Sequence, residues 1–197
     1  MNRLNRVFLT ASLLGAASFA SAVELVSNGN FDLGATNWTE TGAFVIVDDH
    51  SFGTMNTTGN IYAWLGGYDD AVDSLTQVIN FGSLAGTATL SFDFEADDAD
   101  FSTFDFFEVK LGGVTLDTID LGDFADTLTG ISTKTYDVSS FVGTGNKTLE
   151  FLTTTDSSLA SSAFVDNVSI NATVAPEPGT MAALGLGALA LIRRRRA

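Results

Sequence analysis

Strict alternation of apolar and polar residues is the feature that most constrains the fold of this chain. In the segment 90–95 (Leu-Ser-Phe-Asp-Phe-Glu) every second residue is apolar, and the segment 107–111 repeats the pattern. Successive side chains of a β-strand point to opposite faces, so this period of two predicts strands with one face on a core and the other turned away from it. No stretch of the middle of the chain has a helical period long enough to predict a helix. The middle is therefore expected to be all-β.

Glycines and further strand-like segments indicate how these strands are connected. Gly112 and Gly113 separate 107–111 from 114–116, and two glycines supply the positive φ angles of a two-residue hairpin. The other segments with strand-like composition are 44–47, 60–65, 74–81, 134–138, 148–153 and 163–170. Short strands with turns between them are typical of a two-sheet antiparallel β-sandwich, which is the fold class we expect.

The charges are distributed unevenly along the chain. All six arginines lie near the two ends, whereas the segment 23–175 has 23 acidic residues against three lysines and a net charge of −20. Such a surface repels nucleic acid and anionic lipid headgroups, so we expect no nucleic-acid partner. The absence of cysteine excludes disulfides and thiolate chemistry, and it leaves oxygen ligands or the single His50 for any metal.

The first 22 residues have the pattern of a secretion signal peptide. Arg3 and Arg6 form a basic start, an apolar stretch covers 7–19, and the small residues Ala20 and Ala22 suit cleavage after Ala22. The apolar stretch is too short to span a bilayer stably. We therefore expect an N-terminal signal helix that signal peptidase removes during export across the inner membrane.

The C-terminal segment carries a more specific pattern. The only two prolines of the chain, Pro176 and Pro178, flank Glu177, and twelve apolar or small residues follow in 181–192. Proline fixes an extended backbone, so the tripeptide separates a folded domain from a helical tail. A basic cluster after an apolar run stays cytoplasmic, which places the domain across the membrane. Here the cluster consists of Arg193, Arg194, Arg195 and Arg196.

These residues resemble the PEP-CTERM sorting domain of Gram-negative bacteria, whose order is Pro-Glu-Pro, a short apolar helix and an arginine cluster. The resemblance implies recognition by the membrane enzyme exosortase, transient anchoring in the inner membrane, and delivery to the cell surface or an extracellular matrix. The alternative is an ordinary one-pass anchor, but twelve residues fall short of the ~20 that a permanent span needs. The expected organisation is a signal peptide (1–22), a β-sandwich (23–173) and a sorting segment with a short hydrophobic helix (174–197).

Several segments of the middle resemble the galactose-binding-like jelly rolls found in many carbohydrate-binding modules. They are the opening strand 24–32 (Glu-Leu-Val-Ser-Asn-Gly-Asn-Phe-Asp), the middle strands 62–67 and 74–77, and the closing strand 164–170. Together they span most of the mature domain. The resemblance implies that the two sheets are arranged as a jelly roll.

Asp166 lies in a segment that is otherwise apolar at every second position. It shares strand parity with Phe164, Val168 and Ile170, so we expect it to point to the apolar side of its sheet. A carboxylate there is costly unless it is protonated, paired or bound to a metal. The alternative is a carboxylate that accepts backbone N–H groups at a strand end.

The jelly-roll resemblance also implies a metal site. In those proteins the acid of the opening segment and the aspartate of the closing strand together hold a structural calcium ion. The matching positions here are Asp32 and Asp166, with the carbonyl of Asn30 as a third ligand. Oxygen donors from two distant parts of a chain suit Ca²⁺, which takes six to eight of them.

Aromatic residues are candidates for sugar binding, because a ring face offers apolar area beside a polar edge. Tyr68, in the loop 66–70, and Trp64 are the ligand-binding residues we predict, with Tyr68 as an exposed platform. Trp38 is expected to pack in the core. For each ring taken singly, packing is the alternative to ligand binding.

The sequence favours a binding or structural role over catalysis. One histidine gives no triad without an unusual base, and the Gly-x-Ser-x-Gly, His-Glu-x-x-His and phosphate-loop patterns are absent. His50 follows two aspartates and is expected in a solvated loop. We therefore expect a non-enzymatic surface or matrix protein associated with exopolysaccharide in a biofilm. The alternatives are a carbohydrate-binding module with a defined glycan ligand and a small glycan-active hydrolase.

Overall fold

The structure is a computed structural model, and it describes residues 21–82, 84–97, 103–124 and 128–174, together with Gly185. Within it, Ser21–Val174 form one compact unit. The expected signal helix, the tail helix and the sorting residues lie outside the described residues. None of the helical segments in the described ranges is long and apolar enough to cross a bilayer.

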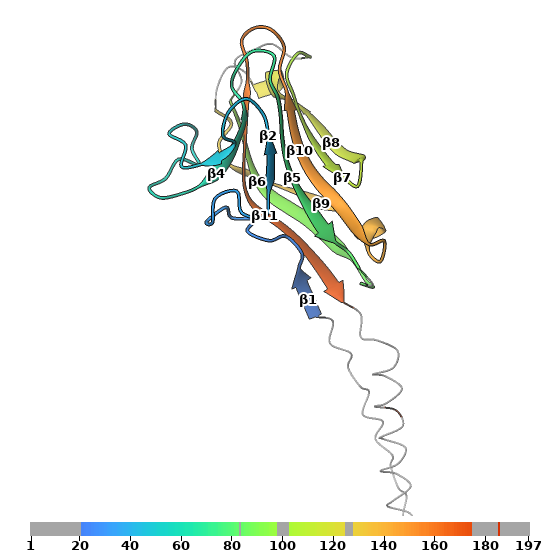
Figure 1. The fold of residues 1–197 in the computed structure, drawn as a ribbon. Helices are drawn as coiled ribbons and strands as arrows, with labels where there is room; N and C mark the ends of the chain where they lie inside the picture. Colours follow the sequence, from blue (N-terminus) through green and yellow to red (C-terminus); the bar gives the residue numbers. More distant parts are fainter. Residues whose placement is uncertain (1–20, 83, 98–102, 125–127, 175–184, 186–197) are drawn as a thin grey trace, which may run out of the picture. The chain divides into compact units, whose positions relative to one another are not determined.

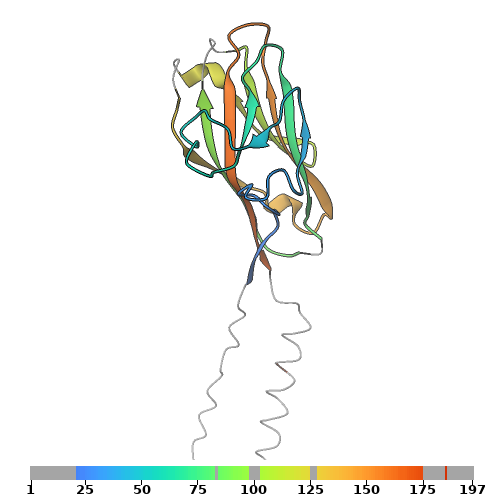
Figure 2. The same cartoon turned by 60° about the vertical axis from the view of Figure 1, so that its left-hand side comes forward.

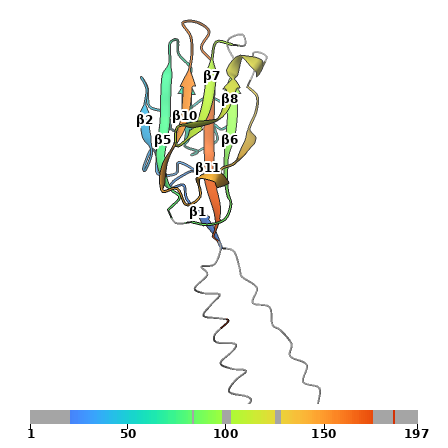
Figure 3. The same ribbon diagram turned by 90° about the vertical axis from the view of Figure 1, so that its right-hand side faces the viewer.

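Two antiparallel sheets face each other (Figures 1 and 3). The first has the order β3-β4-β11-β6-β9, with β1 also paired to β11, and the second has the order β2-β5-β10-β7-β8. The strands are β1 (Ser21–Glu24), β2 (Thr39–Thr41), β3 (Val47–Asp48), β4 (Tyr62–Gly66), β5 (Val72–Asn80), β6 (Ala88–Asp97), β7 (Phe106–Leu111), β8 (Val114–Asp120), β9 (Ser132–Asp137), β10 (Asn146–Thr154) and β11 (Ser162–Val174). Short 3₁₀ turns lie at Leu121–Phe124 and Ser139–Phe141. The predicted all-β two-sheet sandwich is confirmed.

Aromatic side chains fill the space between the sheets. Phe92 of β6 contacts Phe151 of β10 with ring centroids 4.9 Å apart, and Phe107 of β7 stacks on Phe151 at 5.9 Å. All three rings are fully buried, and Trp38 joins the same core as predicted. Rings of this size bury about 150–250 Å² each, so they supply much of the apolar area that holds the two sheets together.

The predicted glycine hairpin is also confirmed. Gly112 and Gly113 have φ angles of 58° and 80°, and they join β7 to β8 with Leu111 opposite Val114. Strand β8 continues four residues beyond the predicted end, because its residues up to Asp120 pair with β7. The opening strand expected at 24–32 was wrong, because only Glu24 belongs to a strand (β1) and the residues after it form a loop. Strand β2 was not predicted, since three residues are too few to show a period.

A loop covers part of the outer face of the first sheet. Glu95 of β6 and Phe164 of β11 pair directly and point away from the core between the sheets, yet both are fully buried. The segment 49–61 crosses this face of the sheet (Figure 2). The Glu95 carboxylate accepts hydrogen bonds from the Thr54 amide (2.8 Å), the Thr54 hydroxyl (2.6 Å) and the Met55 amide (3.2 Å). Bonds to an ionised acceptor are strong, so Glu95 anchors this loop to the sheet.

The two ends of the compact unit lie side by side. Strand β1 pairs with the end of β11, with Ser21 opposite Val174. The predicted cleavage point after Ala22 therefore falls inside β1, while Ala20 lies outside the described residues. That cleavage point and the predicted domain boundaries stay predictions.

Candidate functional site

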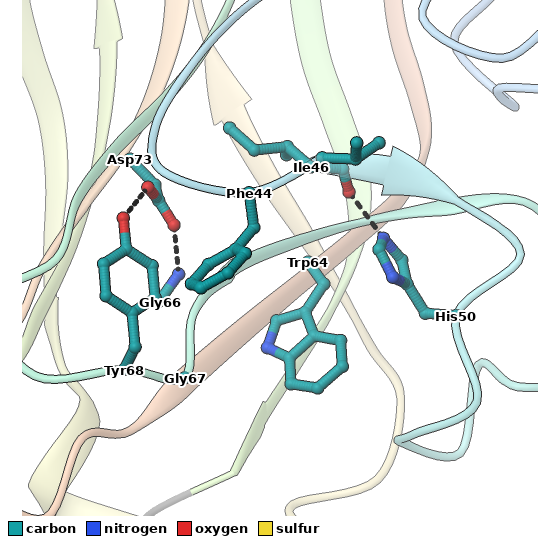
Figure 4. A pocket seen from close by; sticks show the side chains of 9 residues that line it. Phe44, Ile46, His50, Trp64, Gly66, Gly67, Tyr68 and Asp73 are labelled. Atoms are coloured by element: carbon teal, nitrogen blue, oxygen red, sulfur yellow. Dashed lines mark hydrogen bonds between the residues drawn. The ribbon is translucent and has the colours of Figure 1, made fainter.

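A pocket of about 270 Å³ lies beside the end of β4. Three parts of the chain form it: the residues before and after β3, the end of β4 with the loop that follows it, and the start of β5 (Figure 4). Its lining residues are Phe44, Val45, Ile46, His50, Trp64, Gly66, Gly67, Tyr68 and Asp73. Both ligand-binding residues predicted from the sequence, Trp64 and Tyr68, are among them.

Two glycines allow the chain to turn closely around the pocket. Gly66 and Gly67 have φ angles of 82° and 76°, which other residues rarely adopt. A Cβ atom on Gly66 would lie 2.6 Å from the Ser161 carbonyl oxygen, and one on Gly67 would lie 2.9 Å from Trp64 Nε1. The chain therefore needs glycine at both positions to bring the Tyr68 loop against the Trp64 ring.

The aromatic rings of the pocket are held by their neighbours. Figure 4 shows the Phe44 ring between those of Tyr68 and Trp64. Phe44 meets the Tyr68 ring edge to face at 5.1 Å, although 69% of its own surface is exposed. Phe52 stacks on Trp64 at 5.5 Å, and the Trp64 indole N–H donates to the Ser162 hydroxyl at 3.0 Å. The rings are thus oriented before any ligand arrives.

A buried carboxylate forms one side of the pocket. Asp73 is only 2% exposed, and it accepts hydrogen bonds from the Gly66 amide (2.9 Å) and from the Tyr68 hydroxyl. Burial raises the pKa of the Tyr68 phenol, and its hydrogen bond to Asp73 raises that pKa further. The phenol therefore stays a neutral donor to Asp73 rather than the freely exposed platform that we predicted from the sequence.

His50 lies in the loop 49–61, as predicted, but its ring belongs to this aromatic cluster and is only partly exposed to solvent. Its ring is half-buried and meets the rings of Tyr62 and Trp64 edge to face, at 5.3 and 5.4 Å. Its Nε2 lies 2.7 Å from the Ile46 carbonyl oxygen, which requires Nε2 to carry the proton. His50 thereby ties the segment before β3 to the pocket wall.

The chemistry of this pocket is that of a site for a polar ring with apolar faces. Aromatic rings supply apolar surface, while Asp73 and backbone groups supply directed polar contacts. Sequence reasoning missed Phe44 and Asp73. The doublet Gly66-Gly67 was the available signal, because paired glycines after a strand often mark a close backbone approach.

The structure corrects the predicted orientation of Asp166. A β-bulge between Asp166 and Ser169, with Asn167 at a φ of 51°, inserts a residue into β11. As a result Asp166 points with Phe164 to the outer face, whereas Val168 faces the core between the sheets.

Asp166 is nevertheless buried, with 5% of its surface exposed. It accepts hydrogen bonds from the Asn167 amide at 2.7 Å and from Asn60 Nδ2 at 3.2 Å. Burial raises the pKa of its carboxyl, and the negative charges of Asp93 and Asp32 add to that rise, against the opposing effect of the two hydrogen bonds. Asp166, Asp93, Asn60 and Asn167 all line a second hollow, of about 240 Å³.

The other two predicted calcium ligands lie on the opening loop and are exposed. Asn30 Nδ2 donates to the Asp32 carboxylate at 2.5 Å. The loop packs on the bulge of β11, where the Val168 amide donates to the Gly29 carbonyl at 2.8 Å. Oxygen donors of this kind fit Ca²⁺. However, no group of three or more acidic or histidine side chains able to hold one ion is found among the described residues.

The C-terminal segment of the chain matches a known family model. Residues 174–196 match the family model described as the PEP-CTERM protein-sorting motif. The chain carries a PEP-CTERM sorting motif. The motif indicates export and membrane-anchored sorting in a Gram-negative bacterium, as the tripeptide and arginine cluster predicted. A search of curated proteins finds no match to this chain.

Comparison with solved structures supports the jelly roll. The structure of TmCBM61 in complex with β-1,4-galactotriose has a TM-score of 0.53 and 13% identity, over 75% of this chain and 97% of that one. The non-crystalline cellulose specific module CBM28 has a TM-score of 0.44 and 16% identity, over 75% and 94%. The Stig cyclase Fisc from Fischerella sp. TAU has a TM-score of 0.39 and 13% identity, over 79% and 100%. The likeness to TmCBM61, at 13% identity, concerns the fold alone, and it confirms the predicted jelly roll.

Proposed function

We propose that this PEP-CTERM protein is processed by exosortase and binds extracellular polysaccharide through the pocket beside β4. The single observation that carries the binding proposal is the pocket itself, which Phe44, Trp64 and Tyr68 line together with the buried carboxylate of Asp73. The faces of a sugar ring are apolar C–H surfaces, and its rim carries hydroxyl groups. Aromatic rings beside one directed acceptor match both parts.

The pocket favours a carbohydrate-binding module over a purely structural matrix protein. A matrix protein that coats polysaccharide through its charge needs no preformed hollow, whereas the rings here are already oriented by neighbouring side chains. Pre-organised contacts reduce the entropy lost on binding. The likeness to TmCBM61, which is described with β-1,4-galactotriose bound, supports the same proposal.

The hydrolase alternative gains less support from the geometry. Glycosidases generally place two carboxyl groups on either side of the scissile bond. Among the residues that line the pocket, Asp73 is the one carboxylate, and it is already engaged by Gly66 and Tyr68. We therefore propose binding without turnover, on the cell surface or in the exopolysaccharide matrix of a biofilm.

The binding proposal is tested by two variants of the purified full-length protein on a glycan array. Phe44→Ala removes an exposed ring from the pocket, while Phe104→Ala removes a ring that is 50% exposed and does not line it. An aromatic anchor is worth at least 1.4 kcal/mol in typical interfaces, so we expect Phe44→Ala to weaken glycan binding by about tenfold or more and Phe104→Ala to leave it unchanged. Equal effects of both variants, or no selective binding by the wild type, would reject the pocket.

The sorting proposal has a separate test. Mass spectrometry of the protein recovered from its own cells reads both ends. We expect an N-terminus at Val23 and a C-terminus near Pro176–Pro178. A mature protein that retains the arginine cluster would exclude exosortase processing and favour a permanent anchor.

We also propose one structural calcium ion at Asp166, in line with the jelly-roll resemblance. Asp166, Asp32 and the Asn30 carbonyl would hold it, and its charge would offset the buried carboxylate. Its support is the raised pKa of Asp166, because a cation near that group removes the cost of ionising it. Calorimetric titration with CaCl₂ and a melting curve in chelator test it. Absence of both heat and a Tm shift would reject the ion.

A further inference from the structure

The pocket beside β4 carries a negative charge that no basic side chain of its wall neutralises. Asp73 is its only acidic lining residue, and neither lysine nor arginine is among the lining residues. The other titratable side chains that line the pocket are Tyr68 and His50, and His50 Nε2 donates to the Ile46 carbonyl. Asp73 is therefore the one carboxylate of the wall on which the charge of a ligand acts.

The lysines of the domain are occupied elsewhere. Lys110 forms an ion pair with Glu108 at 2.9 Å on the second sheet. Lys134 lies over the Phe94 ring at 5.3 Å, and the side chain of Lys147 lies against Gly112. The segment 23–175 as a whole has a net charge of −20, and none of its three lysines is among the residues that line the pocket.

Asp73 is 2% exposed, so a ligand that fills this pocket removes the little solvent access that its carboxylate has. Two hydrogen bonds, from Gly66 and Tyr68, already reach the carboxylate, and each of its oxygens has a further lone pair to offer. Burying a charge is costly unless it is paired, so an ammonium group of the ligand compensates this loss of water. A hydroxyl group compensates it in part, and a second carboxylate increases the cost.

We infer that the pocket selects glycans with a free amine, that is, de-N-acetylated amino sugars, over neutral sugars and over uronic acids. The inference rests on the proposed glycan binding. It assigns specificity to Asp73, while Phe44, Trp64 and Tyr68 contact the ring irrespective of its charge.

The test compares four short oligosaccharides of equal length by calorimetry with the full-length protein: oligomers of glucosamine, N-acetylglucosamine, glucose and a uronic acid. We expect the glucosamine oligomer to bind about tenfold more tightly than the N-acetylated one and the uronic acid to bind most weakly. Because Asp73 is buried, salt should reduce the preference only weakly, whereas a preference caused by the exposed acidic surface should disappear at high salt.

Matched variants separate the pocket from the general acidity of the domain. Asp73→Asn keeps an acceptor for the Gly66 amide but removes the charge, and it should abolish the preference for glucosamine. Asp69→Asn removes the charge of an exposed neighbour that does not line the pocket, and the preference should persist. If both variants reduce it equally, the preference belongs to the overall charge and the inference is wrong. Melting curves of both variants identify a folding defect. If Asp73→Asn does not fold, the salt dependence of glucosamine binding by the wild type decides whether the preference belongs to the pocket or to the overall charge.

The outcomes distinguish this inference from the proposed function. If none of the four oligosaccharides binds and no other glycan does, the proposed function itself is rejected. If the neutral or N-acetylated oligomer binds as tightly as glucosamine and Phe44→Ala weakens all of them, glycan binding stands and the selectivity for amines is rejected. If the uronic acid binds most tightly, glycan binding stands and the selectivity for amines is likewise rejected.

Discussion

The buried carboxylate of Glu95 offers the sharpest test of how the outer face of the first sheet is held together. The variant Glu95→Gln has nearly the same shape, so it changes the hydrogen bonds while leaving the packing in place. One of the two carboxylate oxygens becomes an NH₂ group. That group then faces the donors of Thr54 and Met55, which at present point to an acceptor.

The magnitude follows from these contacts. A hydrogen bond to a charged group contributes about 1.5–3 kcal/mol, and the bonds of one carboxylate do not add fully. We therefore expect Glu95→Gln to lower the free energy of unfolding by about 3 kcal/mol. For a domain of roughly 150 residues, each kcal/mol shifts Tm by about 2–4 °C, so the expected loss is about 6–12 °C.

Thermal and urea unfolding measure this loss, with Glu150→Gln as the matched control. Glu150 is half-buried on the second sheet, and its replacement should change stability by less than about 0.5 kcal/mol. Hydrogen exchange gives a local reading, because the amides of Thr54 and Met55 should exchange faster in Glu95→Gln. Equal Tm shifts in the two variants, or unchanged exchange at Thr54 and Met55, would refute the anchoring role.

Two further predictions concern backbone strain and pH. Gly66→Ala should destabilise the domain by about 1–2 kcal/mol more than Gly59→Ala. Both glycines have a φ near 80°, but only at Gly66 would a new Cβ lie within 3 Å of another atom, the Ser161 carbonyl oxygen. Equal urea midpoints for the two variants would contradict this close approach. Asp166 has a pKa above its ordinary 3.8 in the folded state, so its contribution to stability is complete below about pH 4 and is lost as the pH rises through the folded pKa. The stability of the wild type relative to Asp166→Asn, measured by urea unfolding in chelator, should therefore decrease as the pH rises above about 4. A constant difference would show that burial does not perturb this group.

The sequence predicted those parts of the fold that depend on local pattern. The alternation at 90–95 placed Phe92 and Phe94 in the core, and the doublet Gly112-Gly113 located a hairpin, because both signals act between near neighbours. The burial of Glu95 was not predictable in this way. It depends on the segment 49–61, which has no period and reaches the sheet through contacts distant in the sequence.

The candidate site, too, was predicted only in the parts that depend on local sequence. Trp64 and Tyr68 could be named from residue type and a glycine-rich loop, but Phe44 and Asp73 join them only through the pairing of distant strands. The orientation of Asp166 failed because a parity argument assumes an unbroken strand. Asparagine tolerates a positive φ better than most residues, so Asn167 was the one sign that the parity changes there.

The two tryptophans of the chain give the most direct test of the central claim that the pocket beside β4 binds a glycan. Trp64 lines the pocket, whereas Trp38 is in the core with its indole N–H donating to the Asn28 carbonyl at 3.0 Å. Each indole N–H gives its own signal in a ¹H–¹⁵N NMR spectrum, and the best-binding oligosaccharide can be titrated against both. The account predicts a saturable shift of the Trp64 signal while the Trp38 signal stays in place. Saturable binding that leaves Trp64 unmoved would contradict it.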